Sequence, residues 1–126
     1  MNIPADQSQC PRCKKGIIRR HSAGATCKYC GRTWLNKSVL LEFKDLENGE
    51  MFIFPEYYPD SVTYNSKDTE QIVWVKAQND TDFPKGRNHW RDNAYRADKP
   101  HLCASAGPLV YVIPIKPIEK ILRGTV

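Results

Sequence analysis

Four cysteines near the start of the chain have the types and spacing of a metal site. They form two C-x-x-C pairs, Cys10 with Cys13 and Cys27 with Cys30, and thirteen residues separate the pairs. Each pair supplies two thiolates from one tight turn, and a short hairpin between the pairs brings the turns together. Four thiolates complete a tetrahedral shell around Zn²⁺ and leave no position for water. The spacing therefore predicts one structural zinc ion.

The residues between the two pairs can form the hairpin that this site requires. Residues 17–21 favour a strand, residues 22–24 a turn, and residues 25–26 the start of a return strand. Gly16 and Gly31 suit the cramped backbone of a metal-binding turn, where positive φ is common. His21 lies between the pairs, but four sulfurs already complete the shell, so we expect an exposed strand or turn residue there.

The segments CPRC (10–13) and CKYCGRTW (27–34), together with the intervening strand, resemble a zinc ribbon. Zinc ribbons occur in transcription factors, polymerase subunits, ribosomal proteins, primases and small viral proteins. The resemblance implies a bound zinc and a local fold for residues 1–37, and it does not by itself imply an activity.

Positive charge is concentrated in the same part of the chain. The net charge is +5, and residues 1–40 hold eight Lys or Arg against a single acidic residue, Asp6. Such a surface attracts phosphate backbones or an acidic protein, although a small module also carries solvated charges for no special reason. Tyr29 adds a ring on which an unpaired base could stack. The predicted nucleic-acid contacts are Lys14, Lys15, Arg19, Arg20, Lys28, Tyr29 and Arg32.

A second basic stretch with aromatic residues lies at 85–99, inside a long polar loop predicted for residues 79–100. It either contacts a partner or is a surface loop whose Trp90 folds back onto the domain. The predicted partner contacts are Tyr57, Tyr58, Arg87, Trp90 and Arg91.

Catalysis has little support in the sequence. His89 and Asp92 are three residues apart and could form a general base with its orienting carboxylate, or a nuclease-like metal site. No second histidine motif, glycine-rich phosphate loop or nucleophile elbow accompanies them. We therefore expect a protein that is not an enzyme, with a small metal-dependent nuclease as a remote alternative.

The remaining chain predicts a small β domain over residues 38–126, joined to the ribbon by the short polar segment 36–38. Strands are expected at 39–43, 51–54, 62–64, 71–77, 101–104 and 109–114, followed by a short C-terminal helix at 118–123. Short strands with two apolar faces favour a mainly β fold, either a bent sheet or a partly open barrel.

This second region resembles a loose group of small phage and bacterial β proteins. The shared pattern is F-x-D-L-x-x-G-x-x-F (43–52), a strand with W-x-K (74–76), an Asn-Ala step (93–94) and a final apolar strand ending in Pro (110–114). The resemblance implies a Src-homology-3-like barrel of phage or bacterial type and no mechanism.

Cysteine usage and hydropathy predict a cytoplasmic protein. The sequence has no apolar run long enough to span a bilayer and no signal-peptide pattern. Five cysteines, four of them in metal spacing, favour a reducing compartment, and Cys103 is expected to be a small strand residue more than a fifth ligand.

The sequence thus predicts a non-enzymatic zinc-ribbon protein that binds nucleic acid, or a nucleic-acid-processing complex, through its basic ribbon face. The alternative is a protein-protein adaptor or inhibitor of a host enzyme, such as a polymerase or a defence system, with the aromatic residues as its contacts.

Overall fold

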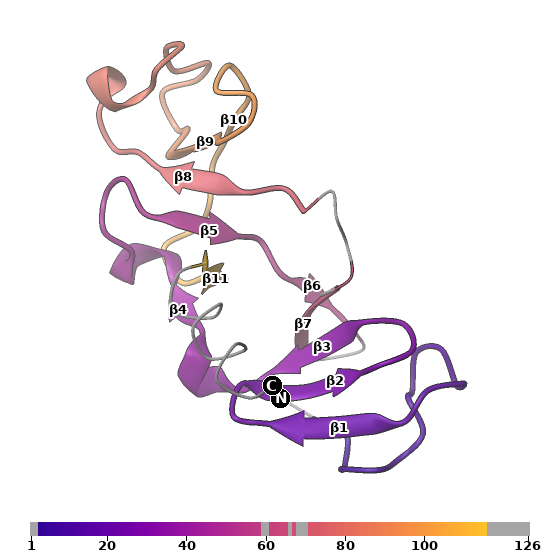
Figure 1. The fold of residues 1–126 in the computed structure, drawn as a ribbon. Helices are drawn as coiled ribbons and strands as arrows, with labels where there is room; N and C mark the ends of the chain where they lie inside the picture. Colours follow the sequence, from indigo (N-terminus) through magenta and orange to yellow (C-terminus); the bar gives the residue numbers. More distant parts are fainter. Residues whose placement is uncertain (1–2, 59–60, 66, 68–70, 116–126) are drawn as a thin grey trace. The chain divides into compact units, whose positions relative to one another are not determined.

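The computed structural model describes residues 3–58, 61–65, 67 and 71–115, and it contains two antiparallel β-sheets (Figure 1). The predicted mainly β fold is confirmed. The C-terminal helix predicted at 118–123 lies outside the described residues. The chain forms two compact units, which are described separately below.

Unit 1 comprises Met1–Leu40, Pro55–Glu70 and Pro117–Val126, and its described part carries a five-stranded sheet in the order β1-β2-β3-β7-β6. The hairpin between the cysteine pairs forms as predicted, with Ile18 opposite Cys27 and His21 opposite Gly24. The strands are β1 (Ile18–His21), β2 (Gly24–Cys27), β3 (Arg32–Leu35), β6 (Glu56–Tyr57) and β7 (Val62–Asn65).

The core of unit 1 lies on one face of this sheet. Because Ile18 faces Cys27 and Ala25 faces Trp34 across the strands, these four side chains share a face, and Cys10 packs against them. Trp34 is only 1% exposed, and its Nε1 donates a hydrogen bond to the carbonyl of Tyr58 at 3.2 Å. The metal-site cysteines are thus part of the core of their own unit.

The units divide the chain differently from the domains expected at 1–37 and 38–126. Strand β3 pairs with β7, with Thr33 opposite Tyr64 and Trp34 opposite Thr63. Residues 55–70 therefore extend the ribbon sheet by two strands. An isolated three-stranded ribbon would leave the edge of β3 unpaired, and β7 satisfies its backbone groups.

Unit 2 comprises Leu41–Phe54 and Gln71–Lys116, and its described part carries a six-stranded sheet in the order β10-β9-β8-β5-β11-β4. The strands are β4 (Leu41–Glu42), β5 (Met51–Ile53), β8 (Trp74–Lys76), β9 (Ala94–Arg96), β10 (Cys103–Ala104) and β11 (Tyr111–Pro114). The described residues also contain three short 3-10 helices, which are η1 (Lys37–Val39), η2 (Phe43–Asp45) and η3 (Asp80–Asp82).

The sheet of unit 2 is open within the described residues, with β10 and β4 at its edges, and it does not close into a barrel. Leu46, Ala94 and Val112 pack with Phe43 and Phe52 in its core. The rings of Phe43 and Phe52 meet edge to face at 5.4 Å between centroids. This apolar cluster fixes η2 against the sheet.

The sequence pattern that resembles phage β proteins maps onto this core. Lys76, 5% exposed, donates from Nζ to the carbonyls of Phe43 at 3.0 Å and Leu46 at 2.6 Å, so it closes the turn around η2. Asn93 donates to the carbonyl of Ala106 and accepts from the amide of Ala106, both at 2.8 Å. The pattern therefore describes residues that hold this sheet together.

Candidate metal centre

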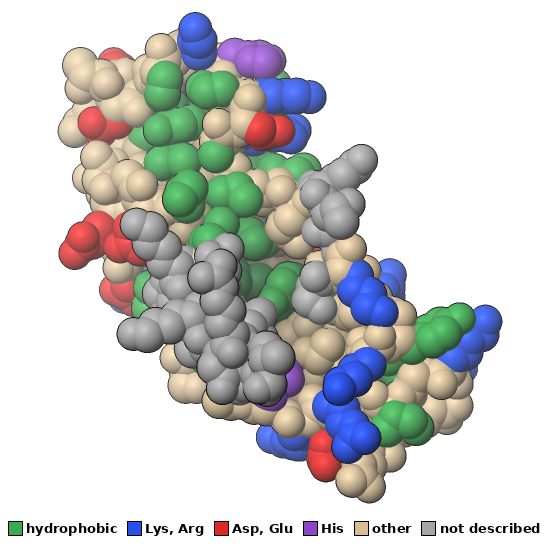
Figure 2. Space-filling model, viewed as in Figure 1, with side chains coloured by type: hydrophobic (Ala, Val, Ile, Leu, Met, Phe, Trp, Pro, Cys, Tyr) green, Lys and Arg blue, Asp and Glu red, His purple; other side chains and the backbone are tan. Residues whose placement is uncertain are grey.

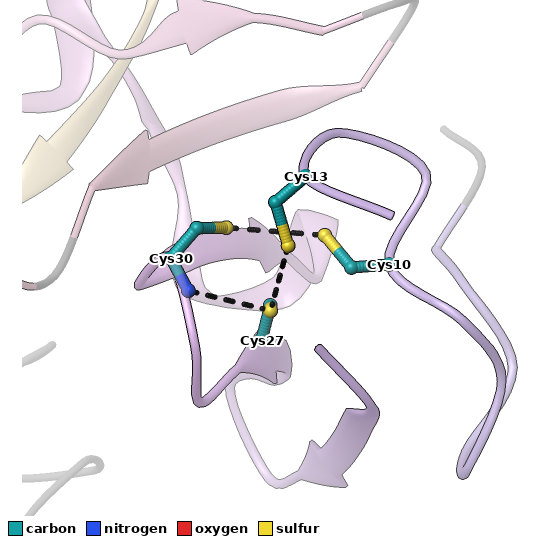
Figure 3. Close-up of side chains that lie close together, drawn as sticks. All are labelled: Cys10, Cys13, Cys27 and Cys30. Carbon is teal, nitrogen blue, oxygen red and sulfur yellow. Dashed lines mark hydrogen bonds between the residues drawn. The ribbon is translucent and has the colours of Figure 1, made fainter. Parts of the chain in front are cut away.

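The side chains of Cys10, Cys13, Cys27 and Cys30 converge in unit 1, with their sulfurs pointing toward one another (Figure 3). All four sulfurs lie within 4.8 Å of one another. The Sγ atoms of Cys10 and Cys30 are 3.9 Å apart, and those of Cys13 and Cys27 are 3.6 Å apart. Tetrahedral Zn–S bonds of about 2.3 Å place two sulfurs about 3.8 Å apart. The four cysteines therefore fit a tetrahedral metal ion.

Each C-x-x-C pair lies on a hydrogen-bonded turn. In the first turn the amide of Cys10 donates to the carbonyl of Gly16 at 2.9 Å, and the amide of Gly16 donates to Cys13 Sγ at 3.4 Å. In the second the amide of Gly31 donates to the carbonyl of Cys27 at 2.9 Å, and the amide of Cys30 lies 3.5 Å from Cys27 Sγ. Amides aimed at sulfur stabilise thiolates and orient them as ligands.

Two glycines are required by space or by conformation at these turns. A Cβ atom on Gly16 would lie 2.3 Å from Cys27 Sγ, which no real contact allows. Gly31 has φ +82°, and a Cβ there would lie 2.7 Å from Asn65 Oδ1. Glycine at position 16 lets the backbone pass close to a sulfur, and glycine at position 31 allows the positive φ and the close approach of Asn65.

The two cysteines of the first turn differ in acidity. Burial raises the pKa of the Cys10 thiol to about 12. The backbone amide of Lys15, helped by that of Gly16, lowers the pKa of Cys13 to about 6. The amides thus favour the thiolate of Cys13, whereas burial favours the thiol of Cys10, which loses its proton when a metal ion binds.

Basic side chains surround the cysteine turns. Lys14, Lys15 and Lys28 are exposed, and Tyr29 is 61% exposed. Lys15 Nζ lies 5.9 Å from the centre of the Tyr29 ring, so the two turns contribute to one surface. Figure 2 shows Lys and Arg side chains gathered over the ribbon strands. Lys14, Lys15, Lys28 and Tyr29 are together called the knuckle surface.

The two arginines of β1 lie on different faces of the sheet. Arg19 pairs with Thr26 and Arg20 with Ala25, and successive strand residues point to opposite faces. Both side chains are exposed, and the amide of Arg20 donates to Asp6 Oδ1 at 2.9 Å. The predicted basic residues thus cover both sides of an edge strand.

Arg32 is placed inside unit 1, away from the predicted nucleic-acid surface. It is 3% exposed, and its Nη1 donates to Glu56 at 2.6 Å and to Thr63 at 3.0 Å. Burial of a guanidinium requires such partners. Arg32 therefore ties β3 to β6 and β7, and we leave it out of the contact surface.

Lys67 belongs to the surroundings of the metal centre although the sequence did not single it out. Its Nζ donates to the carbonyls of Lys28 at 2.5 Å and Tyr29 at 2.9 Å. It thereby holds the second cysteine turn from a segment nearly forty positions later in the chain. To predict this contact from the sequence, one would first have to predict that β3 pairs with β7.

The predicted partner residues fall into both units. In unit 1, Tyr57 is 59% exposed, and the hydroxyl of Tyr58 donates to the carbonyl of Pro11 at 3.3 Å. In unit 2, Trp90 is 71% exposed and Arg91 lies over its ring at 4.8 Å, while Arg87 is mostly enclosed by its own loop. Trp90 does not fold back onto the domain.

His89 and Asp92 are engaged with backbone groups in a turn. Asp92 Oδ2 accepts from the amide of His89 at 2.9 Å, and His89 Nδ1 accepts from the amide of Arg91 at 3.2 Å. These bonds account for their three-residue spacing.

In unit 1, His21 Nε2 lies 2.7 Å from Thr26 Oγ1, and burial lowers the pKa of His21. Cys103, in β10 of unit 2, is half-buried.

No family model, curated protein or solved structure matches the chain. Within the described residues, none of the helical segments has the length and apolar character needed to cross a bilayer. The assignment of a site therefore depends on the cysteine geometry, which defines a protein with a candidate four-thiolate metal centre in a β-rich unit.

Proposed function

We propose that this chain is a non-enzymatic zinc-ribbon protein of phage or bacterial origin that binds nucleic acid, or a nucleic-acid-processing complex, through the basic surface of unit 1. The observation that carries the proposal is the combination of four convergent sulfurs with exposed cations on the same two turns. Zinc is the metal that fits best, because it favours four thiolates in a closed tetrahedral site.

The electrostatics of unit 1 support phosphate recognition. Asp6 is the single acidic residue among residues 1–40, and it lies close to Arg20. Four thiolates and one zinc together carry a charge of about −2, which leaves the module positive. The exposed ring of Tyr29 beside Lys15 offers stacking next to a cation, which suits a strand with an unpaired base.

The test is the salt dependence of nucleic-acid binding by the zinc-loaded chain. Each phosphate contact adds about 0.7–0.9 to the slope of log affinity against log salt, so the double variant Arg19→Glu with Arg20→Glu should flatten the slope by about 1–2. We expect its affinity at low salt to fall at least about tenfold. Fluorescence anisotropy with labelled duplex and single-stranded oligonucleotides measures both.

The matched control is Lys85→Glu with Lys99→Glu, which makes the same charge change on exposed residues of unit 2. Its effect on the salt slope should be smaller than that of the β1 variant. Binding that is absent, insensitive to salt or unaffected by the β1 variant would contradict the proposal.

A protein partner is the second candidate, favoured by the exposure of Tyr57. This tyrosine lies in β6, one of the two edge strands of the unit 1 sheet within the described residues, and an exposed aromatic ring at a strand edge can receive another chain. A pull-down that survives nuclease treatment and high salt, and that is lost in Tyr57→Ala, would favour an adaptor or inhibitor.

A further inference from the structure

Unit 2 has a hollow of about 370 Å³ beside the exposed Trp90. This volume lies within the range of small-molecule sites. Phe43, Pro108 and Trp90 contribute apolar surface to its wall, and Lys44, Lys76, Arg87 and Arg91 contribute cations. Asp92 is the one acidic residue in the wall. The hollow is called the Trp90 pocket below.

Positive charge in the wall is partly compensated by carboxylates. Lys76 is bonded to carbonyls, and no carboxylate within the described part of the chain pairs with it. Arg87 Nε lies 3.1 Å from Asp80, whose side chain is 85% exposed, without forming a hydrogen bond. Lys44 Nζ lies 3.5 Å from Glu42 at the surface. Three carboxylates, Asp92 in the wall and Asp80 and Glu42 beside it, thus oppose the four cations, so a small positive charge remains and favours an anion.

The loop that carries Trp90 is ordered by its own hydrogen bonds. Arg87 Nη1 donates to the carbonyl of Trp90 at 2.8 Å, and Asp92 accepts the amide of His89. The His89 ring stacks on the Trp90 ring at 5.7 Å, and the Arg91 guanidinium lies 4.8 Å from the ring centre. Figure 2 shows cationic and histidine side chains at the surface near β9 and β10. The hydrogen bonds fix the backbone of the loop, and the ring that it carries stays 71% exposed, so its exposed part is available for contact.

We propose that the Trp90 pocket binds an unpaired nucleotide, with the base against the aromatic and apolar wall and the phosphate near Arg91 and Lys44. Rings stack on bases of any sequence, and guanidinium and ammonium groups pair with phosphate. The site is separate from the basic surface of unit 1 and does not require it.

An extended acidic peptide fits the pocket less well. Lys76, one of the lining residues, lies in β8, and this strand is paired with β5 on one side and with β9 on the other. An extended peptide binds by main-chain hydrogen bonds to an unpaired strand edge, and β8 offers no such edge. A base gains from ring faces without any main-chain pairing.

The test uses the full zinc-loaded chain and an oligothymidylate of about twelve nucleotides. Binding should quench tryptophan fluorescence, because Trp90 is 71% exposed, whereas Trp34 is buried and Trp74 is partly buried. Trp90→Ala should abolish the quenching and weaken binding about tenfold, measured by anisotropy of a labelled strand. Arg91→Glu should weaken binding by a similar factor, whereas Lys99→Glu, an equal charge change outside the wall, should have an effect of about twofold or less.

Thymidine monophosphate tests whether the pocket accepts a free nucleotide. Quenching by the monophosphate that is lost in Trp90→Ala would show that one nucleotide suffices, and quenching by the strand alone would show that the nucleotide must be part of a chain. Either result supports the proposal.

Three results would overturn it. They are a strand that binds without quenching, unchanged affinity in both Trp90→Ala and Arg91→Glu, and equal competition by polyglutamate at the same charge concentration. The variant Arg19→Glu with Arg20→Glu separates this site from the proposed function. It should lower overall affinity yet retain the Trp90 quenching at saturating strand.

Discussion

Single residues around the cysteines decide whether a metal can bind. The cysteine pairs and both glycines were predicted from the sequence, because a C-x-x-C turn is local and its ligands lie within a few positions of each other. The burial of Arg32 was not predictable in this way. Its partners Glu56 and Thr63 follow 24 and 31 positions later, so only the folded sheet reveals them.

Gly16→Ala should weaken zinc binding although it changes no ligand. The new Cβ would lie 2.3 Å from Cys27 Sγ and 2.7 Å from Tyr29 Cβ, so the sulfur or the second turn must move. Changes that disturb ligand orientation typically cost about 10–100-fold in metal affinity. Competition with a chromogenic chelator measures the loss.

Gly49→Ala is the control for the glycine prediction. Gly49 has φ +91° in unit 2, and a Cβ added at this position would meet no atom within 4 Å, so alanine should strain the backbone without touching the sulfurs. Equal zinc affinity in Gly16→Ala and the unchanged chain would show that the close approach does not constrain the site.

The short elements of unit 2 show where sequence patterns succeed and fail. Strands near 51–54 and 109–114 were predicted because apolar and β-branched residues concentrate there, and β5 and β11 form within them. Of the strand expected at 39–43 only Leu41–Glu42 forms, as β4, because η1 ends at Val39 and η2 begins at Phe43. The amide of Phe43 donates to the carbonyl of Val110, a contact that local propensity does not encode.

Lys76→Met should destabilise unit 2 by about 2–4 kcal/mol, because the buried carbonyls of Phe43 and Leu46 lose their donor. Methionine keeps much of the side-chain volume, so lost hydrogen bonds dominate the change. Urea unfolding followed by tryptophan fluorescence measures the free energy of unfolding.

Lys99→Met provides the comparison for Lys76, since Lys99 is exposed and its side chain is outside the core. Surface changes of this kind stay within about 0.5 kcal/mol. A Lys76→Met chain as stable as the Lys99→Met chain would remove the structural role assigned to Lys76.

The whole molecule combines a unit that carries the four-cysteine cluster with a second unit whose core is apolar. The sequence predicted a mainly β chain and a ribbon, but it placed residues 55–70 with the second domain. Their pairing with β3 spans about thirty positions, with Arg32 opposite Asn65 and Trp34 opposite Thr63. Pairing over such distances depends on tertiary contacts and leaves no periodic signal in either strand.

Acid should release the metal from unit 1. Metal binding displaces protons from the thiols, and the pKa of Cys10 is raised by burial while that of Cys13 is lowered to about 6 by backbone amides. As pH falls, protons compete for all four sulfurs, so the stability contributed by the metal is present at neutral pH and is lost on acidification. Zinc release during a pH titration, followed with a chromogenic chelator, measures the effect, and retention of the metal in strong acid would contradict it.

The zinc content of the freshly purified, folded chain tests the central claim most directly. Elemental analysis should find about one zinc per chain, and Cys103→Ser should retain it because that thiol lies in the other unit. The double variant Cys10→Ser with Cys27→Ser should lose it. A folded chain without stoichiometric zinc, or full zinc retention in the double variant, would contradict the account.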